Sequence, residues 1–202
     1  MGLAMVHKPW YFPCMTTKLR NTWATFTAGE AEKITGLSPD TQRDWRRRGF
    51  LDAPEKGWSR YELRDLAELL VMSALQERGI GPSISKNIAG VVALRLSFFV
   101  VSWVEAIDDR TNGEMEKIIQ QRRKLVGETR GHFFITPSTE PRRFVIFWAN
   151  GTTEFVEDIG KAFSELSSDP RYHGAILVLD LEALATLLIE RAGRPFVSVE
   201  LR

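Results

Sequence analysis

A short segment in the N-terminal third of the chain concentrates positive charge on a few neighbouring positions. Its four arginines are Arg43, Arg46, Arg47 and Arg48. Arginine pairs with DNA phosphates and, through two parallel hydrogen bonds, with the edge of guanine. A helix that presented these side chains on one face could therefore enter a DNA groove. The segment also contains Asp40 and Asp44, and the same charges would suit a helix face that only meets water.

The residues around the arginines indicate where such a helix starts and stops. Ser38 can accept hydrogen bonds from the unpaired amides of a first turn, and Pro39 suits the first helical position because no amide hydrogen is needed there. Gly49 can adopt the left-handed conformation that ends a helix. We therefore expect a helix that begins at Pro39 and ends just before Gly49.

A second helix is expected immediately before this one, over residues 28–35. Thr27 and Glu30 have the spacing of a capping box, in which each side chain bonds the backbone amide of the other residue. Gly36 then breaks the helix, which leaves the short turn before Ser38 that a helix-turn-helix requires.

The segment after Gly49 predicts a wing and then a longer helix. Residues 52–59 contain Pro54 and Gly57, which favour a short loop. A helix over residues 63–78 follows, and its apolar side chains lie on one stripe, as expected for a helix packed on a core.

This series of residues resembles the winged helix-turn-helix of the MerR transcriptional regulators and, more loosely, the winged helices of phage excisionases. The resemblance covers residues 26–88. The matching positions are Thr27, Gly36, Leu37, Ser38, Thr41, Arg43, Trp45, Gly49, Phe50, Leu51, Gly57, Trp58, Arg60, Tyr61, Asp65 and Leu66. Three positions differ, because Asp40, Gln42 and Ser59 stand where the family usually has arginine, an aliphatic residue and arginine.

The resemblance implies a bacterial DNA-binding regulator, and it supplies a set of expected DNA contacts. We expect Gln42, Arg43 and Arg46 to read bases, since glutamine pairs with adenine and arginine with guanine. The full expected set is Gln42, Arg43, Trp45, Arg46, Arg47, Arg48, Lys56, Trp58, Arg60 and Tyr61. Trp45 must also face partly inward, and Trp58 and Tyr61 could equally be core anchors.

Composition limits the other classes of function. The 202 residues carry a net charge of only +1, so affinity for nucleic acid has to come from local clusters of charge. The single cysteine, Cys14, excludes a disulfide framework and cysteine-cluster metal sites. His132 and His173 lack ligand or catalytic spacing, and Asp180 fits a helix cap. We therefore expect a protein that binds no metal or cofactor and is not an enzyme.

Residues 1–24 contain three basic side chains and no acidic one. They predict a mobile basic arm, which could enter a minor groove, be only a disordered tail, or partly precede an internal start at Met15. The arm lacks the continuous apolar stretch of a secretory signal. We therefore expect a cytoplasmic protein associated with the nucleoid.

Residues 83–127 are expected to form linking helices, the first running from about residue 83 to residue 109. Its middle, residues 90–107, is nearly all apolar, but Arg95 and Glu105 interrupt it, so the uninterrupted stretch is too short for a membrane span. Such a helix must be buried on most sides. We expect a homodimer that buries Phe98, Phe99 and Trp103, with the polar positions Arg95, Ser102, Glu105 and Asp109 left for water.

The remainder, residues 128–202, predicts a small α/β domain of unknown role. The hydrophobic period changes to that of strands after residue 131, and Asn150-Gly151 favours a two-residue hairpin turn. The expected fold is thus α+β. A winged helix-turn-helix over residues 25–82 is joined by the long apolar helix to this C-terminal domain.

The sequence leaves three functions open. The first is a MerR-like regulator that binds double-stranded DNA as a dimer at an inverted repeat, with RNA polymerase as a further partner and an unknown effector. The second is an excisionase-like factor that bends DNA. The third is an interaction protein whose winged helix binds another protein.

Overall fold

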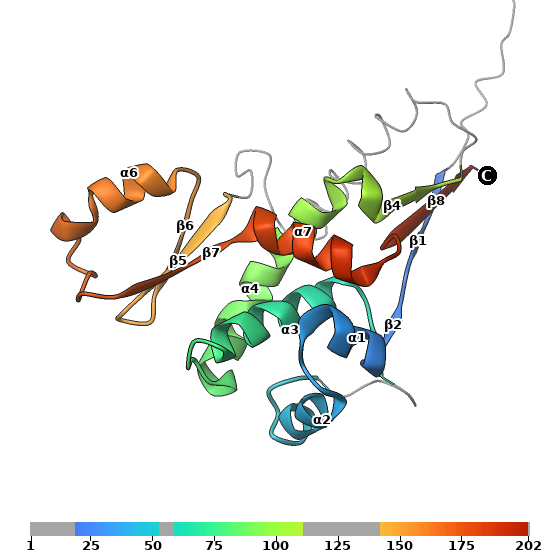
Figure 1. Ribbon diagram of the computed structural model, residues 1–202, viewed down its shortest axis with the longest axis horizontal. Coiled ribbons are helices and arrows are strands. Elements are labelled where there is room, and N and C mark those ends of the chain that lie inside the picture. Colours follow the sequence, from blue (N-terminus) through green and yellow to red (C-terminus); the bar gives the residue numbers. More distant parts are fainter. Residues whose placement is uncertain (1–18, 53–58, 111–141, 202) are drawn as a thin grey trace, which may run out of the picture.

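The structure is a computed structural model that describes residues 19–52, 59–110 and 142–201, and it is an α+β protein (Figure 1). The N-terminal elements are β1 (Leu19–Trp23), β2 (Phe26–Thr27), α1 (Ala28–Thr35), α2 (Pro39–Arg47), β3 (Arg60–Tyr61), α3 (Leu63–Gln76) and α4 (Pro82–Val101). The C-terminal elements are the 3₁₀ turn η1 (Val104–Ala106), β4 (Ile107–Asp109), β5 (Phe144–Trp148), β6 (Thr153–Val156), α6 (Ile159–Ser164), the 3₁₀ turn η2 (Leu166–Ser168), β7 (Ile176–Asp180), α7 (Leu181–Ala192) and β8 (Val197–Leu201).

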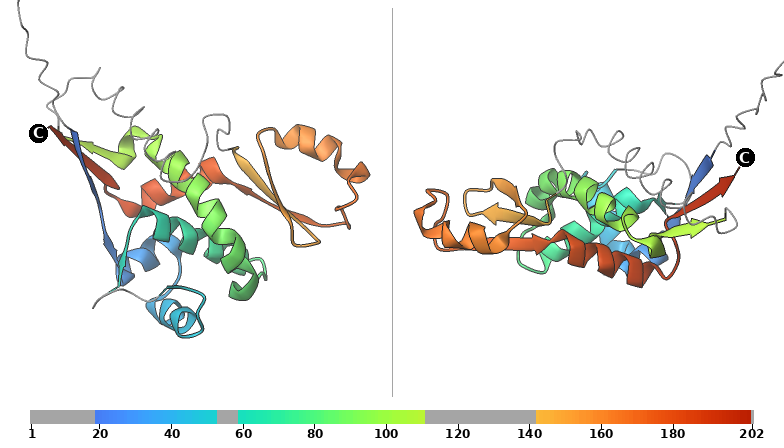
Figure 2. Two further views of the ribbon diagram at one scale, coloured as in Figure 1. Left: turned by 180° about the vertical axis from the view of Figure 1, so that it is seen from behind. Right: turned by 90° about the horizontal axis from the view of Figure 1, so that it is seen from above.

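The main hydrophobic core lies among the helices α1, α3, α4 and α7. The apolar stripe predicted for the third helix is confirmed, since Leu66, Leu70 and Val71 of α3 are buried. Helix α7 contributes Leu181, Ala185 and Leu188 to the same core. Both views in Figure 2 show α7 lying along these helices rather than apart from them.

Three small sheets surround this core. Strand β8 lies between β1, to which it is antiparallel, and β4, to which it is parallel. Strands β2 and β3 pair with Phe26 opposite Tyr61 and Thr27 opposite Arg60. Strand β5 lies between β6 and β7 in an antiparallel sheet. We call this last sheet together with α6 the β-lobe (residues 144–180), and in Figure 1 it extends to the left of the helical core.

The expected mobile arm is corrected over its last residues. Residues 19–23 form β1, and all five pair with β8 in antiparallel register. The backbone amide of Ala24 also donates to the Phe196 carbonyl, at 2.8 Å. The hydrogen-bond partners of β1 come from the other end of the chain, so local composition could not reveal the strand. Residues 1–18 lie outside the described part of the chain.

The long linking helix is shorter than predicted. It ends at Val101, and residues 107–109, expected to be helical, form β4 beside β8. The Phe196 amide donates to the Ala106 carbonyl at 2.9 Å, so pairing with β8 replaces helix hydrogen bonds in this segment. The polar positions Arg95, Ser102 and Asp109 therefore do not form a stripe on one helix. The helix predicted over residues 114–126 lies outside the described residues.

Helix α4 is long and apolar enough to span a membrane by length and composition alone, a test that the core helix of a folded protein also passes. One side of α4 is buried inside this protein, including Ala89, Val92, Leu96 and Val100. These spacings of three and four residues place one face of α4 in the core.

The predicted elements of the C-terminal part are confirmed where the structure describes them. The predicted hairpin is present, but its loop has three residues, 149–151, rather than two, because the Trp148 amide donates to the Thr152 carbonyl at 2.9 Å. Gly151 has the left-handed φ of 82° that such a loop places at its last position. Asp180 caps α7, accepting from the amides of Glu182 and Ala183. The C-terminal part is nevertheless not set apart from the rest, because α7 and β8 share a core and a sheet with N-terminal elements.

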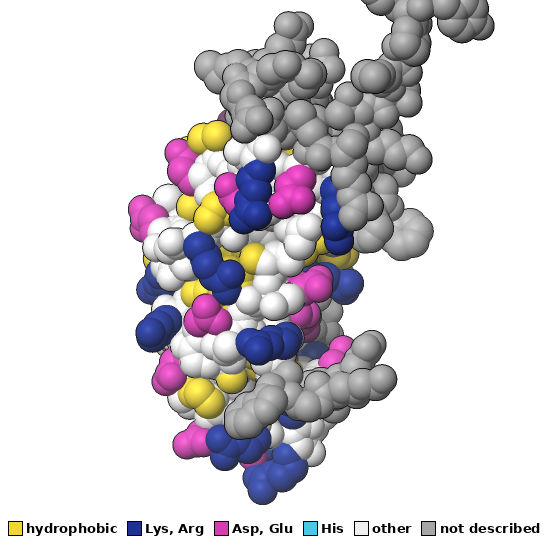
Figure 3. Space-filling view, turned by 90° about the vertical axis from the view of Figure 1, so that its right-hand side faces the viewer, with side chains coloured by type: hydrophobic (Ala, Val, Ile, Leu, Met, Phe, Trp, Pro, Cys, Tyr) yellow, Lys and Arg dark blue, Asp and Glu magenta, His cyan; other side chains and the backbone are white. Residues whose placement is uncertain are grey.

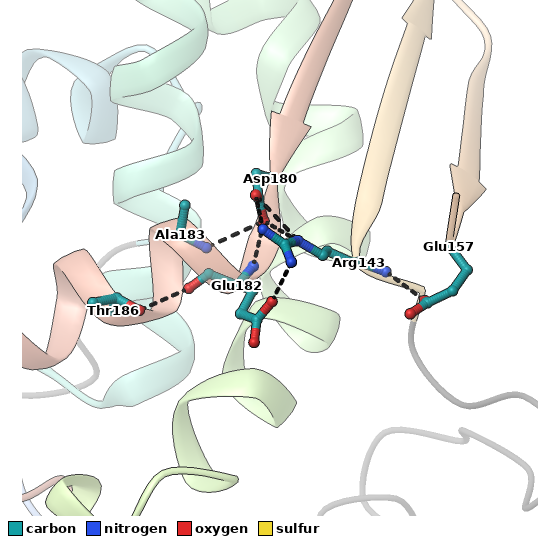
Figure 4. A network of polar contacts seen from close by, with 6 residues as sticks. All are labelled: Arg143, Glu157, Asp180, Glu182, Ala183 and Thr186. Atoms are coloured by element: carbon teal, nitrogen blue, oxygen red, sulfur yellow. Dashed lines mark hydrogen bonds and ion pairs between the residues drawn. The ribbon is translucent and has the colours of Figure 1, made fainter. Parts of the chain in front are cut away.

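A charged network joins the β-lobe to α7 (Figure 4). Arg143, just before β5, places its Nη2 atom 2.6 Å from Asp180 Oδ2 and its Nη1 atom 2.8 Å from Glu182 Oε2. Its backbone amide donates to Glu157 at 3.1 Å. The pKa of Arg143 is raised chiefly by its hydrogen bond to Asp180. Arg143, the residue before β5, is thus paired with Asp180, the residue that caps α7.

The position of α7 gives a stability prediction. Leu188→Ala should lower the free energy of unfolding by about 2–5 kcal/mol, because it leaves a cavity in the shared core. We expect unfolding of the whole helical core in one transition, measured by urea denaturation followed by circular dichroism. Glu190→Ala, at an exposed position on the same helix, should change it by less than about 0.5 kcal/mol. Two separate transitions would contradict the shared core.

Candidate nucleic-acid interface

The predicted start and stop of α2 are confirmed by its capping hydrogen bonds. The Ser38 side chain accepts from the Thr41 amide at 3.2 Å, and Pro39 occupies the first helical position. Gly49 follows the helix with a φ of 74°, and the Phe50 amide bonds back to the Trp45 carbonyl at 2.8 Å. The predicted capping box of α1 is also present.

The inner face of α2 is fixed by an aromatic ring and an amide. Trp45 is 3% exposed and packs in the core. Gln42 is 0% exposed, and its Nε2 atom donates to the Leu37 carbonyl at 2.7 Å and to the Ala28 carbonyl at 3.3 Å. The Tyr61 hydroxyl donates to Gln42 Oε1 at 2.7 Å. Both polar ends of this buried amide are therefore satisfied, as burial demands.

These positions correct part of the predicted DNA-contact set. The expectation that Gln42 reads a base is wrong, because its side chain is buried and fully hydrogen-bonded. Trp45 and Tyr61, also expected at the DNA surface, lie in the core, and Tyr61 is only 6% exposed. For Tyr61 the alternative of a core anchor is the one the structure has. Lys56 and Trp58 lie outside the described residues.

The outer face of α2 carries the exposed arginines. Arg43 Nη2 lies 3.1 Å from Asp40 Oδ1, and Arg47 Nη2 lies 2.6 Å from Asp44 Oδ1. Arg48 reaches the other oxygen of Asp44 at 3.5 Å. The hydrogen bond from Arg47 is the main reason that the pKa of Asp44 is lowered. Exposed pairs of this kind contribute little to stability, so DNA phosphates could replace the carboxylates at small cost.

Figure 3 shows these charges on the surface. Lys and Arg side chains gather at the lower end of the molecule, where α2 lies in Figure 1, with Asp and Glu side chains among them. The arginines of α2 thus occupy one end of the molecule rather than a broad basic face.

Two of the arginines lie over aromatic rings. The Arg46 guanidinium carbon is 5.3 Å from the centre of the Tyr61 ring, and that of Arg48 is 4.9 Å from the Phe50 ring. Arg46 is half-buried, and this burial lowers its pKa. Arg60, on β3 beside Tyr61, is exposed. The end of α2 thus contacts strand β3 through the Tyr61 ring, and β3 adds a further exposed cation.

Side chains far along the chain hold the helix-turn-helix in place. Lys86 of α4 donates to the Gly49 carbonyl just after α2. Arg191 of α7 donates to the Ile34 carbonyl of α1 at 3.1 Å. Arg194 donates to the Thr25 carbonyl at 2.9 Å and pairs with Glu30 at 3.2 Å.

Sequence reasoning missed these supporting residues. Their partners are 37 to 169 positions away in the chain, so no spacing could reveal them. Arg191 lies in the last turn of α7, where a cation is favoured by the helix dipole whether or not it has a distant partner. Within the part of the chain that the structure describes, no group of three His, Cys, Asp or Glu side chains could hold a metal ion.

Comparison with known families agrees with this geometry. Residues 26–88 match the model of the MerR HTH family regulatory proteins. This segment is a MerR-type helix-turn-helix domain. It contains α1, α2, the β2–β3 pair and α3, and it ends within α4. The protein is therefore a DNA-binding transcription regulator with a winged helix-turn-helix. No curated protein matches the chain.

The MerR-type domain yields a pH prediction through Glu30. The pKa of Glu30 is lowered, first by its hydrogen bond with the Thr27 backbone and also by Arg194. A lowered pKa stabilises the fold above the ordinary value of 4.5, and the contribution is lost as the pH falls through the lowered value. Glu30→Gln should therefore lower the melting temperature at pH 7, and the difference from wild type should shrink below pH 4.5.

Melting curves recorded from pH 7 down to pH 3 would measure this difference. Glu32→Gln, at an exposed position on the same helix, is the matched control. Equal losses at pH 7 for the two variants would show that the capping box and Arg194 contribute nothing through Glu30.

Proposed function

We propose that this regulator binds an inverted-repeat operator as a homodimer, with α2 of each subunit in a major groove. The observation that supports it most directly is the two-sided character of α2. Its inner face is fixed by Trp45 and Gln42, while Arg43 and Arg47 project outward. A helix held rigidly on one side can present its other side to base edges in a defined register.

The remaining surface of α4 supports the dimer. Ile84 is 57% exposed and Val91 is 47% exposed, and the spacing of seven residues places them on one side of α4. Phe98 and Phe99 are only partly buried, and Phe99 packs against the core of its own chain. We therefore centre the proposed interface on Ile84 and Val91, with Phe98 and Trp103 toward its end. Pairing of two α4 helices would set the spacing between the two copies of α2.

The β-lobe is the proposed site of control, where an effector or a partner protein would act. It lies beside α7, which contacts α1 through Arg191. It also touches α4, because the Arg95 guanidinium carbon lies 3.7 Å from the centre of the Phe155 ring. A change at the lobe would thus reach both the DNA-binding helices and the proposed dimer helix. In this proposal the protein acts in the cytoplasm on the nucleoid, with RNA polymerase as the partner at promoters.

Sequencing genomic fragments retained by the purified protein tests the function. We expect enrichment of inverted repeats within promoters. Enrichment at a phage attachment site, with bending of the bound DNA, would support an excisionase-like factor instead. If no DNA fragment is enriched at any salt concentration, the remaining function is that of an interaction protein whose winged helix binds another protein.

The first functional prediction concerns base reading. Arg43→Ala should weaken binding to the selected site by about 1–3 kcal/mol and relax the sequence preference, because a bidentate arginine contact discriminates between bases. Arg60→Ala should weaken binding to all sequences alike, because Arg60 on β3 would contact backbone phosphates beside the groove rather than base edges in it. Fluorescence anisotropy with the selected and scrambled duplexes measures both. Unchanged preference in Arg43→Ala would place base reading elsewhere.

The second functional prediction concerns assembly. Val91→Glu should give monomers, because it places a charge in the proposed interface without disturbing the core of its own subunit. Light scattering after size exclusion would show the change in mass, and the melting temperature would show that the fold survives. Glu77→Gln, in the turn after α3, is the control. A wild-type protein that stays monomeric at tens of micromolar would remove the dimer from the proposal.

A further inference from the structure

Arg46 differs from the other arginines of α2 in its ionic partners. Arg43 pairs with Asp40, and Arg47 and Arg48 share Asp44. Among the described residues, Arg46 has no carboxylate within ion-pair distance. Its guanidinium lies over the Tyr61 ring and is half-buried. A cation placed in this way keeps its N–H donors for an acceptor beside the ring, and a bidentate anion matches their geometry.

The ring beneath Arg46 is itself fixed. Tyr61 is paired opposite Phe26 in the β2–β3 sheet and is 6% exposed. Its hydroxyl donates to Gln42, whose amide in turn donates to the Leu37 carbonyl in the turn of the helix-turn-helix. Gln42 precedes Arg46 by one helical turn. Helix α2 therefore contacts Tyr61 twice. Gln42 bonds the hydroxyl, and Arg46, one turn later, lies over the ring.

The place of Arg46 along α2 indicates which part of DNA it meets. The N-terminal residues of a recognition helix contact base edges in the major groove. Arg46 lies in the last turn, next to β3 and the exposed Arg60. If the N-terminal part of α2 enters the major groove, a side chain in its last turn beside β3 would face the sugar–phosphate backbone that borders the groove.

We propose that Arg46 contacts a DNA backbone phosphate rather than a base, and that Tyr61, fixed by Gln42, is the positioning residue that holds Arg46 for this contact. The inference rests on the proposed DNA-binding function and refines it. It also assigns a role to Gln42, which stands where the family usually has an aliphatic side chain. Its amide links the turn, the recognition helix and strand β3 in a way that an aliphatic residue could not.

The test compares affinities of single and double variants for the selected duplex and a scrambled duplex over a range of salt concentrations. Arg46→Gln should weaken binding to both duplexes by the same factor, about eightfold at 0.1 M salt, and lower the salt slope by about one, because one released counterion is lost. Tyr61→Leu removes the ring and should have a similar effect. The double variant should bind no more weakly than Arg46→Gln alone.

Phe50→Leu is the matched control, since it removes the ring beneath Arg48 on the same helix. In the double variant Phe50→Leu with Arg46→Gln, the two factors by which affinity falls should multiply, as expected for independent contacts. Tyr61→Phe keeps the ring and removes the bond to Gln42 Oε1, so it tests whether Gln42 fixes the ring. It should weaken binding less than Tyr61→Leu, and its loss should disappear in the background of Arg46→Gln. Melting curves establish that each variant is folded.

Three results would overturn the inference while leaving the proposed function in place. Relaxed preference at one base pair, with an unchanged salt slope, would make Arg46 a base reader. Multiplied effects of Arg46→Gln and either Tyr61 variant would deny the positioning role. An Arg46→Gln protein that binds as the wild type does would remove the contact. Failure of the wild-type protein to bind any selected duplex would instead overturn the proposed function.

Discussion

The burial of one face of α7 against α1 and α4 is the packing interaction on which the rest of the molecule depends. Leu181, Ala185 and Leu188 lie at spacings of four and three residues and are fully buried in a core shared with the DNA-binding helices. This burial positions Arg191 and Arg194 to bond the backbone of the helix-turn-helix. The MerR-type domain is thus packed against a helix more than a hundred positions away in the chain, and the strand that follows this helix, β8, pairs with β1 and β4 outside the domain.

The sequence predicted local structure well, because local hydrogen bonds determine it. Ser38 and Gly49 marked the limits of α2, Asp180 marked the start of α7, and Asn150-Gly151 marked a hairpin. Long-range pairing left no comparable signal. Residues 19–23 are predicted from the sequence as part of a basic arm because nothing local indicates their pairing with β8. Residues 107–109 are predicted at the end of the linking helix, although they pair with β8 as a strand.

The candidate site was predicted unevenly for a related reason. Arginine composition located the recognition helix, but composition cannot tell which side of a helix faces the core. Gln42 has the chemistry of an adenine reader and serves instead as a buried connector, because the Tyr61 hydroxyl and the Leu37 carbonyl lie within its reach. Asp40 and Asp44 set the character of the outer face, since they hold Arg43, Arg47 and Arg48 in surface pairs that leave the α2 end of the molecule only moderately basic.

The sheet formed by β1, β8 and β4 bears on how the protein is made. Residues of the helix-turn-helix leave the ribosome long before α7 and β8 do, so α1 can pack against α3 but lacks its contacts with α7 during that interval. Most N-terminal domains fold as units while synthesis continues. Here the pairing of β1 with β8 and the packing of α7 are contacts between distant positions, and such contacts form late. The contacts by which α7, Arg191 and Arg194 hold the helix-turn-helix can therefore form only after the C-terminal elements have been synthesised.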